Sequence, residues 1–192
     1  MASSTRDALV VAAADLMDEG GLEAVTLREV GHRAGVSHNA PYKHFADKEA
    51  LLAAVAAREL TRRGETIAKT VAGPRSPEAA IREMVHGYVA WALAHPVRFK
   101  LVYGAWSKGS EELAAAAHAA RGRMVDAVAA AQRSGGLPDG DPERVTALLL
   151  ALAHGAVDLA LAGHLSPEGK GHAGPDDLVD DLFRHLAAAA GA

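Results

Sequence analysis

The chain has 192 residues, of which 49% are hydrophobic and 23% are charged, and it carries a formal net charge of −4 at pH 7. This length and apolar content suffice for the core of one or two domains and exclude a disordered chain. The absence of cysteine excludes disulfide frameworks, thiolate metal sites and cysteine nucleophiles. Aromatic residues make up only 4%, and alanine, the best helix former, is abundant, so the composition favours an all-α fold.

The N-terminus lacks the basic cluster of a secretory signal, and its apolar stretch contains acids. The segment Val145–Gly163 approaches the length of a membrane span, but His154 and Asp158 lie near its middle. A helix that is apolar nearly all round is also typical of one buried between a core and a partner subunit. We therefore expect a soluble, cytoplasmic protein that does not bind a membrane.

Helix start and stop signals divide the chain into about nine helices. The four N-terminal ones are expected over residues 5–19, 27–34, 37–45 and 47–70. A Gly pair at 20–21 ends the first, a capping box at Thr26 and Glu29 opens the second, and Ser37 caps the third. Beyond a break at residues 72–77 the helices lengthen. The predicted organisation is a DNA-binding domain over 1–50, a linking helix over 47–71, and a second helical domain over 72–192.

The second and third expected helices, joined by the tight turn at residues 34–37, form a helix-turn-helix. In this motif the first helix braces the second, whose N-terminal residues enter the major groove of DNA. The segment 28–48 holds more bases than acids inside an acidic chain: the bases are Arg28, Arg33, Lys43 and Lys48, and the acids are Glu29 and Asp47. A local positive patch of this kind indicates phosphate binding.

The segment TLREVGHRAGVSHNAPYKHFADKEALLAAV closely resembles the DNA-binding segment of the TetR family of transcriptional regulators, and the resemblance extends over residues 5–60. It implies contacts to base edges or nearby phosphates from Ser37, His38, Asn39 and Ala40. It implies phosphate contacts from Tyr42, Lys43, His44 and Lys48, and backbone contacts from Thr26 and Arg28. Phe45 is expected in the core, and His32 is either a surface residue or a phosphate ligand.

Pro41 departs from the family pattern, in which most members have an aliphatic residue at this position. Proline lacks an N–H and is tolerated only in the first turn of a helix. It is therefore expected either to tilt the recognition helix or to tighten its start.

The C-terminal part resembles the subgroup of the family that carries a Trp…His-Gly signature, through residues 88–99 and 150–155, although Leu150 stands where the signature has Trp. Two helix faces are candidates for binding an effector: Met84, Tyr88, Trp91 and His95 on one helix, and Leu150, His154 and Asp158 on another. The first face is equally consistent with ordinary core. His154 and Asp158 are interpreted as a buried hydrogen-bonded pair, an effector anchor or two metal ligands. We expect no cofactor and no metal site.

The final helix carries an apolar stripe that predicts a dimer interface: Leu178, Val179, Leu182, Phe183 and Leu186. Together with the preceding apolar helix it would form a four-helix bundle across a two-fold axis. The acids at the start of this helix suit its dipole.

The leading interpretation is a homodimeric, ligand-responsive repressor that binds a palindromic operator in double-stranded DNA and is released by a small organic effector. One alternative is a DNA-binding protein without an effector. Another is a small helical metalloenzyme using His86, His154 and Asp158, but no nucleophile elbow, phosphate loop or HExxH pattern is present, so no enzymatic activity is expected. The sequence names neither the operator nor the effector, and it leaves repression and activation open.

Overall fold

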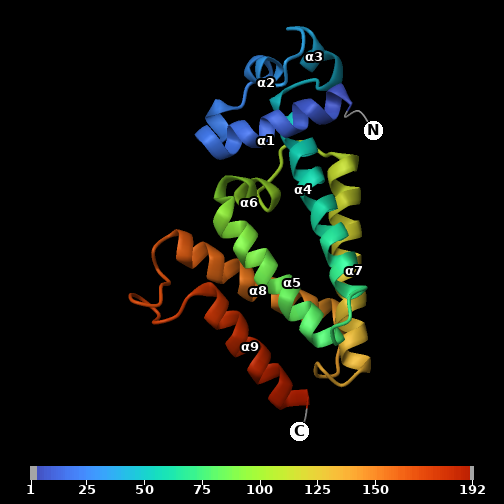
Figure 1. The fold of residues 1–192 in the computed structure, drawn as a ribbon, viewed down its shortest axis with the longest axis vertical. Helices are drawn as coiled ribbons and strands as arrows, with labels where there is room; N and C mark the ends of the chain where they lie inside the picture. Colours follow the sequence, from blue (N-terminus) through green and yellow to red (C-terminus); the bar gives the residue numbers. More distant parts are fainter. Residues whose placement is uncertain (1–3, 191–192) are drawn as a thin grey trace. The chain divides into compact units, whose positions relative to one another are not determined.

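The computed structural model describes residues 4–190, and over this range the fold is all-α, with nine helices and no strand (Figure 1). The helices are α1 (Thr5–Ala24), α2 (Leu27–Arg33), α3 (Ala40–His44), α4 (Lys48–Val71), α5 (Pro77–Ala94), α6 (Pro96–Val102), α7 (Glu111–Arg133), α8 (Pro142–Leu161) and α9 (Pro175–Ala190). The predicted fold class is confirmed.

Local capping explains where the first helix begins. The Ser4 hydroxyl accepts a hydrogen bond from the Asp7 amide (3.1 Å), and the Asp7 carboxylate accepts one from the Ser4 amide (3.3 Å). The hydrogen bond from Ser4 also lowers the pKa of Asp7. The helix is interrupted at Gly21, whose φ of 72° lies in the left-handed region that glycine tolerates, and one further turn follows to Ala24.

The helices gather into two compact units. The first contains the chain up to Arg62 together with His95–His118, and the second contains Arg63–Ala94 together with the chain from Ala119 onward. The helix α6 and the start of α7 therefore pack with the N-terminal helices, although the sequence assigned them to the second domain. The boundary at residue 72, as the limit of an independently folding domain, stays a prediction.

In the first unit, α1 packs against α2, α3 and α6. The buried core side chains of this unit include Leu9, Met17, Val30, Phe45, Leu51, Val55 and Phe99, which come from α1, α2, α4, α6 and the residue after α3. Phe45 lies in this core, as expected.

A buried arginine on α6 joins three helices of the first unit. The Arg98 guanidinium donates to Asp18 of α1 (2.6 Å) and to Glu59 of α4 (3.3 Å), and its side chain is only 10% exposed. The same Asp18 oxygen lies 3.0 Å from Nδ1 of His95. Because a buried cation is costly unless it is paired, this network holds α6 against α1 and α4.

The loop between α6 and α7 is fastened to the start of α4. The Glu49 carboxylate accepts hydrogen bonds from the backbone amides of Ser107 (2.9 Å) and Lys108 (3.0 Å), and from the Ser107 hydroxyl. The Lys108 ammonium donates to Asp47 (2.5 Å). The Ser107 hydroxyl lowers the pKa of Glu49, and the Lys108 ammonium lowers the pKa of Asp47. Both carboxylates therefore stay ionised at neutral pH and keep the loop attached.

In the second unit, α5, α8 and α9 pack against one another around a core that includes Val85, Val89, Leu149, Ala153, Val157, Val179 and Phe183. Polar contacts also join α5 to α9. The two ring nitrogens of His86 lie 2.6 Å from Asp176 and 2.8 Å from Asp180, and Arg82 donates to the same Asp180 oxygen at 2.7 Å. The hydrogen bond from Arg82 is the main cause of a lowered pKa at Asp180.

The helix α8 is long and apolar enough to cross a membrane by length and composition alone, which is weak evidence for a span when one such helix is present. Only 28% of its most apolar window is buried inside the chain. Leu148 is 68% exposed and Leu159 is 47% exposed. An apolar face of α8 is therefore left uncovered by its own chain.

Replacing Arg98 with Met should lower the free energy of unfolding by about 3 kcal/mol, because the Glu59 carboxylate, 7% exposed, would stay buried without a cation. Urea denaturation monitored by circular dichroism measures the loss. The double variant Arg98→Met/Glu59→Leu removes both charges and should recover most of it. Equal losses in the single and double variants would contradict an electrostatic role for the pair.

Candidate nucleic-acid interface

The helix α2 and the turn after it form as the sequence predicts. The Thr26 hydroxyl accepts a hydrogen bond from the Glu29 amide (3.1 Å) and so caps α2. The turn depends on Gly35, whose φ is 66°, and the amide of Val36 bonds back to the Gly31 carbonyl (3.1 Å). This short turn sets the angle at which the next helix leaves.

The recognition helix α3 begins later than predicted. Ser37 does not cap it: the chain makes a turn in which the Ala40 amide bonds to the Ser37 carbonyl (2.9 Å), and the N-cap is Asn39, whose side chain makes no capping bond. The physical reason is Pro41, which a helix accommodates only in its first turn. The helix therefore starts at Ala40.

Pro41 is buried against α2, where a glycine makes room for it. A Cβ added to Gly31 would lie 2.8 Å from Cγ of Pro41, closer than real Cβ contacts come. The proline ring thus occupies the space that a side chain at position 31 would need. The late helix start is a third consequence, and the expected tilt or tightening of α3 stays a prediction.

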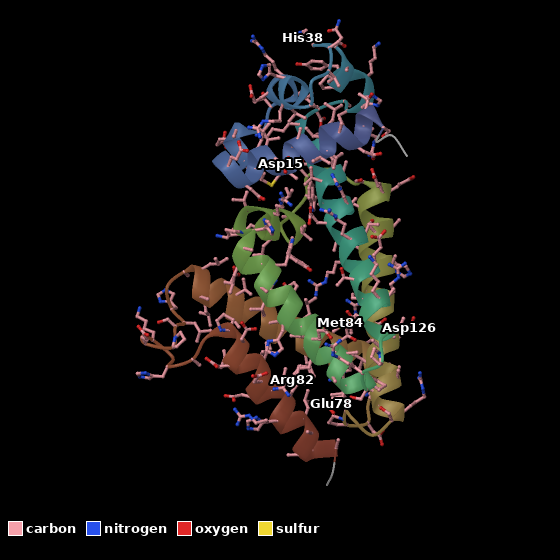
Figure 2. The ribbon with its side chains drawn as sticks, viewed as in Figure 1. Asp15, His38, Glu78, Arg82, Met84 and Asp126 are labelled. Carbon is pink, nitrogen blue, oxygen red and sulfur yellow. The ribbon has the colours of Figure 1, made fainter. Side chains whose placement is uncertain are left out.

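The outward side of this motif is polar. Eight of the residues implied in DNA contacts have exposed side chains, namely Thr26, Arg28, Ser37, His38, Asn39, Tyr42, Lys43 and His44, while Ala40 is half-buried. Tyr42 is 54% exposed, and its ring meets that of His38 edge-on, with centroids 6.1 Å apart. His38 lies at the outer edge of the unit, in the turn before α3 (Figure 2). His32 is also exposed, as a surface residue or phosphate ligand would be.

The cations of this segment differ in whether they are already engaged. Arg33 binds Glu19 through two hydrogen bonds of 2.7 and 2.6 Å, which raise the pKa of Arg33 and lower that of Glu19. The Lys48 ammonium donates to the Leu22 carbonyl at 2.6 Å. Over residues 4–190, Arg28 and Lys43 form no ion pair. These two exposed cations are fully available to an anionic partner, and Lys48 is available through its remaining N–H donors.

The four residues of the first candidate effector face, Met84, Tyr88, Trp91 and His95, are divided between the two units. Met84 and Tyr88 are buried in the second unit, and Trp91 is half-buried on the same helix. His95 belongs to the first unit, where its Nδ1 contacts Asp18.

The second candidate face is corrected by the packing of α8. Leu149, not Leu150, faces the core, and Leu150 is 37% exposed. His154 and Asp158 are not a buried hydrogen-bonded pair: Nε2 of His154 lies 3.9 Å from the carboxylate, too far for a hydrogen bond, and both side chains are partly exposed. His154 instead contacts the Tyr88 hydroxyl through Nδ1, at 2.9 Å. Within the described part of the chain, no group of three or more His, Asp or Glu side chains is placed to hold a metal ion.

The predicted dimer stripe divides into two sets. Val179 and Phe183 are 0% and 2% exposed, so they are core residues of their own chain and the prediction that they form the dimer surface is wrong. The reason is that one side of the amphipathic α9 packs on α5 and α8. Leu178, Leu182 and Leu186 are only half-buried.

Two arginine contacts were missed from the sequence. The Arg6 guanidinium lies over the Phe45 ring, 5.3 Å from its centroid, and that of Arg63 lies over the Tyr88 ring at 4.1 Å. Neither contact follows from spacing along one helix, because each joins residues far apart in the chain.

Comparison with known proteins adds two family matches. Residues 9–55 match the model of bacterial regulatory proteins of the tetR family, and residues 81–190 match the tetracyclin repressor-like C-terminal domain. Among curated proteins, the Escherichia coli tetracycline repressor protein class C is 41% identical over 56 residues, which are 29% of this chain. The matched segments span 26% to 48% of the length of the curated relatives.

Solved structures match over almost the whole chain. A protein of unknown function from Rhodococcus sp. RHA1 is 31% identical, with a TM-score of 0.80 and 97% coverage of both chains. SmeT, the repressor of the Stenotrophomonas maltophilia multidrug efflux pump SmeDEF, is 26% identical, with a TM-score of 0.64 and coverage of 95% of this chain and 90% of its own.

The contact between Gly31 and Pro41 predicts that Gly31→Ala destabilises the protein by about 1–3 kcal/mol, because the added methyl would push α2 and α3 apart. Thermal and urea unfolding measure this change. Gly31→Ala/Pro41→Ala removes the colliding ring and should restore much of the loss. If Gly31→Ala unfolds like the wild type, the close packing of these two residues is not what positions α3.

Proposed function

The chain belongs to the TetR family of DNA-binding transcriptional regulators, and we propose that it is a ligand-responsive repressor that binds a palindromic operator as a homodimer. The observation that carries the proposal is the exposed polar surface of α3 and the preceding turn, with the exposed cations Lys43 on α3 and Arg28 on α2, which form no ion pair within residues 4–190. Both relatives that are named as repressors support repression as the output. We place this activity in the cytoplasm.

On the surface of α3 and the preceding turn, we assign some residues to contacts with base edges and others to contacts with phosphates. The amide of Asn39 and the ring of His38 project from the turn that precedes α3, where a recognition helix meets base edges. Around them, phosphates would be bound by Thr26, Arg28, Tyr42, Lys43 and His44. Lys48 uses one of its three N–H donors on the Leu22 carbonyl, which leaves two for a phosphate.

The proposed dimer uses the apolar surface that the chain leaves uncovered. Leu148 and Leu159 on α8 are exposed, and Leu178, Leu182 and Leu186 lie on the half-buried side of α9. Packing these two helices against the same pair of a second copy gives an isologous four-helix bundle. A two-fold axis then presents two recognition helices to half-sites about one helical turn apart.

The proposed release step requires an effector that binds one conformation better than another. A ligand with such a preference shifts the population toward a spacing of recognition helices that does not fit both half-sites. Tyr88 and His154 are the predicted effector residues that contact each other in the second unit. A regulator that bound its operator with no small molecule able to release it would instead fit the alternative of an effector-free DNA-binding protein.

The test of the proposed function is footprinting of the purified protein on its own upstream region, with protection of a two-fold symmetric site as the expected result. On that site, Lys43→Ala should weaken binding to all sequences and reduce the salt dependence by about one phosphate contact. Asn39→Ala should instead reduce discrimination between the operator and its point variants, by about 1–3 kcal/mol at the affected base pair.

Lys100→Ala is the matched control for these variants, because Lys100 is an exposed lysine on α6, away from the recognition surface. It should keep the affinity and the salt slope of the wild type. If Lys43→Ala and Asn39→Ala behave like this control in a salt titration, the assignment of the DNA contacts is wrong.

The dimer predicts that Leu148→Arg splits the protein into monomers, since it places a charge in the apolar bundle. Losing the second half-site should then remove most of the operator affinity. Sedimentation equilibrium and operator binding measure both effects.

Leu93→Arg is the control for the dimer, because Leu93 is a similarly apolar, partly exposed residue on α5 (37%) outside the proposed bundle. It should stay dimeric. A Leu148→Arg protein that sediments as a dimer would place the interface elsewhere.

A further inference from the structure

Arg63, in the second unit, places its positive charge over a buried aromatic ring. Arg63 on α4 is half-buried, and its guanidinium carbon lies 4.1 Å from the centroid of the Tyr88 ring. Tyr88 is itself 2% exposed, so the charge rests on a buried aromatic face. This contact holds the guanidinium in place through its attraction to the π-system.

Arg63 has this aromatic contact but no carboxylate. Within residues 4–190 no acidic side chain pairs with it. The acid one turn earlier on the same helix, Glu59, is engaged by Arg98. A partly desolvated guanidinium with no anion is energetically unfavourable, because stacking on a ring replaces only part of its hydration. By contrast, Arg82 and Arg121 of the same unit each bind a carboxylate.

The Tyr88 ring that Arg63 contacts also belongs to a polar pair. The Tyr88 hydroxyl lies 2.9 Å from Nδ1 of His154, so the ring under the guanidinium is oriented at its far end by α8. Trp91 lies three residues beyond Tyr88 on α5 and so shares its face of the helix. Aromatic surface beside a fixed cation is the environment that binds a molecule with an apolar body and one negative group.

We propose that Arg63 binds the anionic group of the effector, and that the effector is an amphipathic carboxylate with an apolar or aromatic body. This inference rests on the proposed function and names the chemical class of its ligand. The contact with Tyr88 uses the π-system of the ring and no carboxylate, so the planar N–H donors of the guanidinium remain for an anion. A carboxylate accepts two parallel hydrogen bonds from these planar donors, which an ammonium cannot offer in the same geometry.

The experiment compares carboxylates with their neutral amides of the same shape. The probes are phenylacetate, indole-3-acetate and decanoate, each paired with its primary amide, and binding is measured by calorimetry and thermal shift at pH 7.5. For the wild type, at least one carboxylate should bind tenfold or more tightly than its amide. In Arg63→Gln that preference should disappear, while binding of the amide stays the same.

Two further variants make the result specific. Arg133→Gln removes an exposed arginine from the end of α7 and should keep the wild-type preference. Arg63→Lys retains the charge but loses the planar guanidinium, and its preference for a carboxylate over the amide should fall at least threefold. If circular dichroism shows that Arg63→Gln does not fold, the Arg63→Lys variant supplies the test in its place. The inference is overturned if no probe carboxylate binds better than its amide, or if the preference persists in the Arg63 variants.

Footprinting of the wild-type protein separates this inference from the proposed function. Protection of a symmetric operator without any carboxylate preference would overturn only the role of Arg63. Absence of specific DNA protection would overturn the repressor, whatever the probes do.

Discussion

The first unit depends on one buried charge. Arg98 lies on α6, and its two terminal nitrogens donate to Asp18 of α1 and Glu59 of α4. The helix α1 also packs against α2 and α3, which form the helix-turn-helix, so the same helix that pairs with Arg98 supports the DNA-binding motif. Because α6 follows α5 after the single residue His95, the chain itself connects the core of the second unit to this network.

A second constraint fixes the recognition helix. A helix of five residues contributes little stability of its own, so α3 takes its position from its neighbours. Pro41 would destabilise the interior of a helix, because its missing N–H would remove a backbone hydrogen bond. In the first turn that N–H would have no partner within the helix, and the proline ring fills the space above Gly31. The delayed start leaves Ser37, His38 and Asn39 in a turn with exposed side chains. The residue that departs from the family pattern therefore determines which side chains are presented.

Sequence signals located the helices well, because their ends depend on neighbours within four residues. Thr26, Gly35 and Pro77 act through capping, left-handed backbone and first-turn geometry, which are local. The side of a helix that becomes buried is decided by distant elements, and here the sequence was less informative. Leu149 and Leu150 are equally apolar, yet only the first is buried when α8 packs with α5 and α9. Likewise, nothing local distinguishes Phe183, which is core, from Leu182, which is half-buried.

The exposed apolar face of α8 indicates a contact with another copy of the chain. Apolar side chains on a helix are normally covered by the core of the chain or by a partner, and Leu148 at 68% exposure has no cover from its own chain. A membrane would cover the helix all round, but α8 buries Thr146, Leu149 and Val157 against its own unit, so only one side remains. That side lies on the same helix as His154, which contacts Tyr88 beneath Arg63. A ligand bound at Arg63 would therefore act on a helix that also forms the proposed dimer, so effector binding and dimer packing would share one element of the second unit.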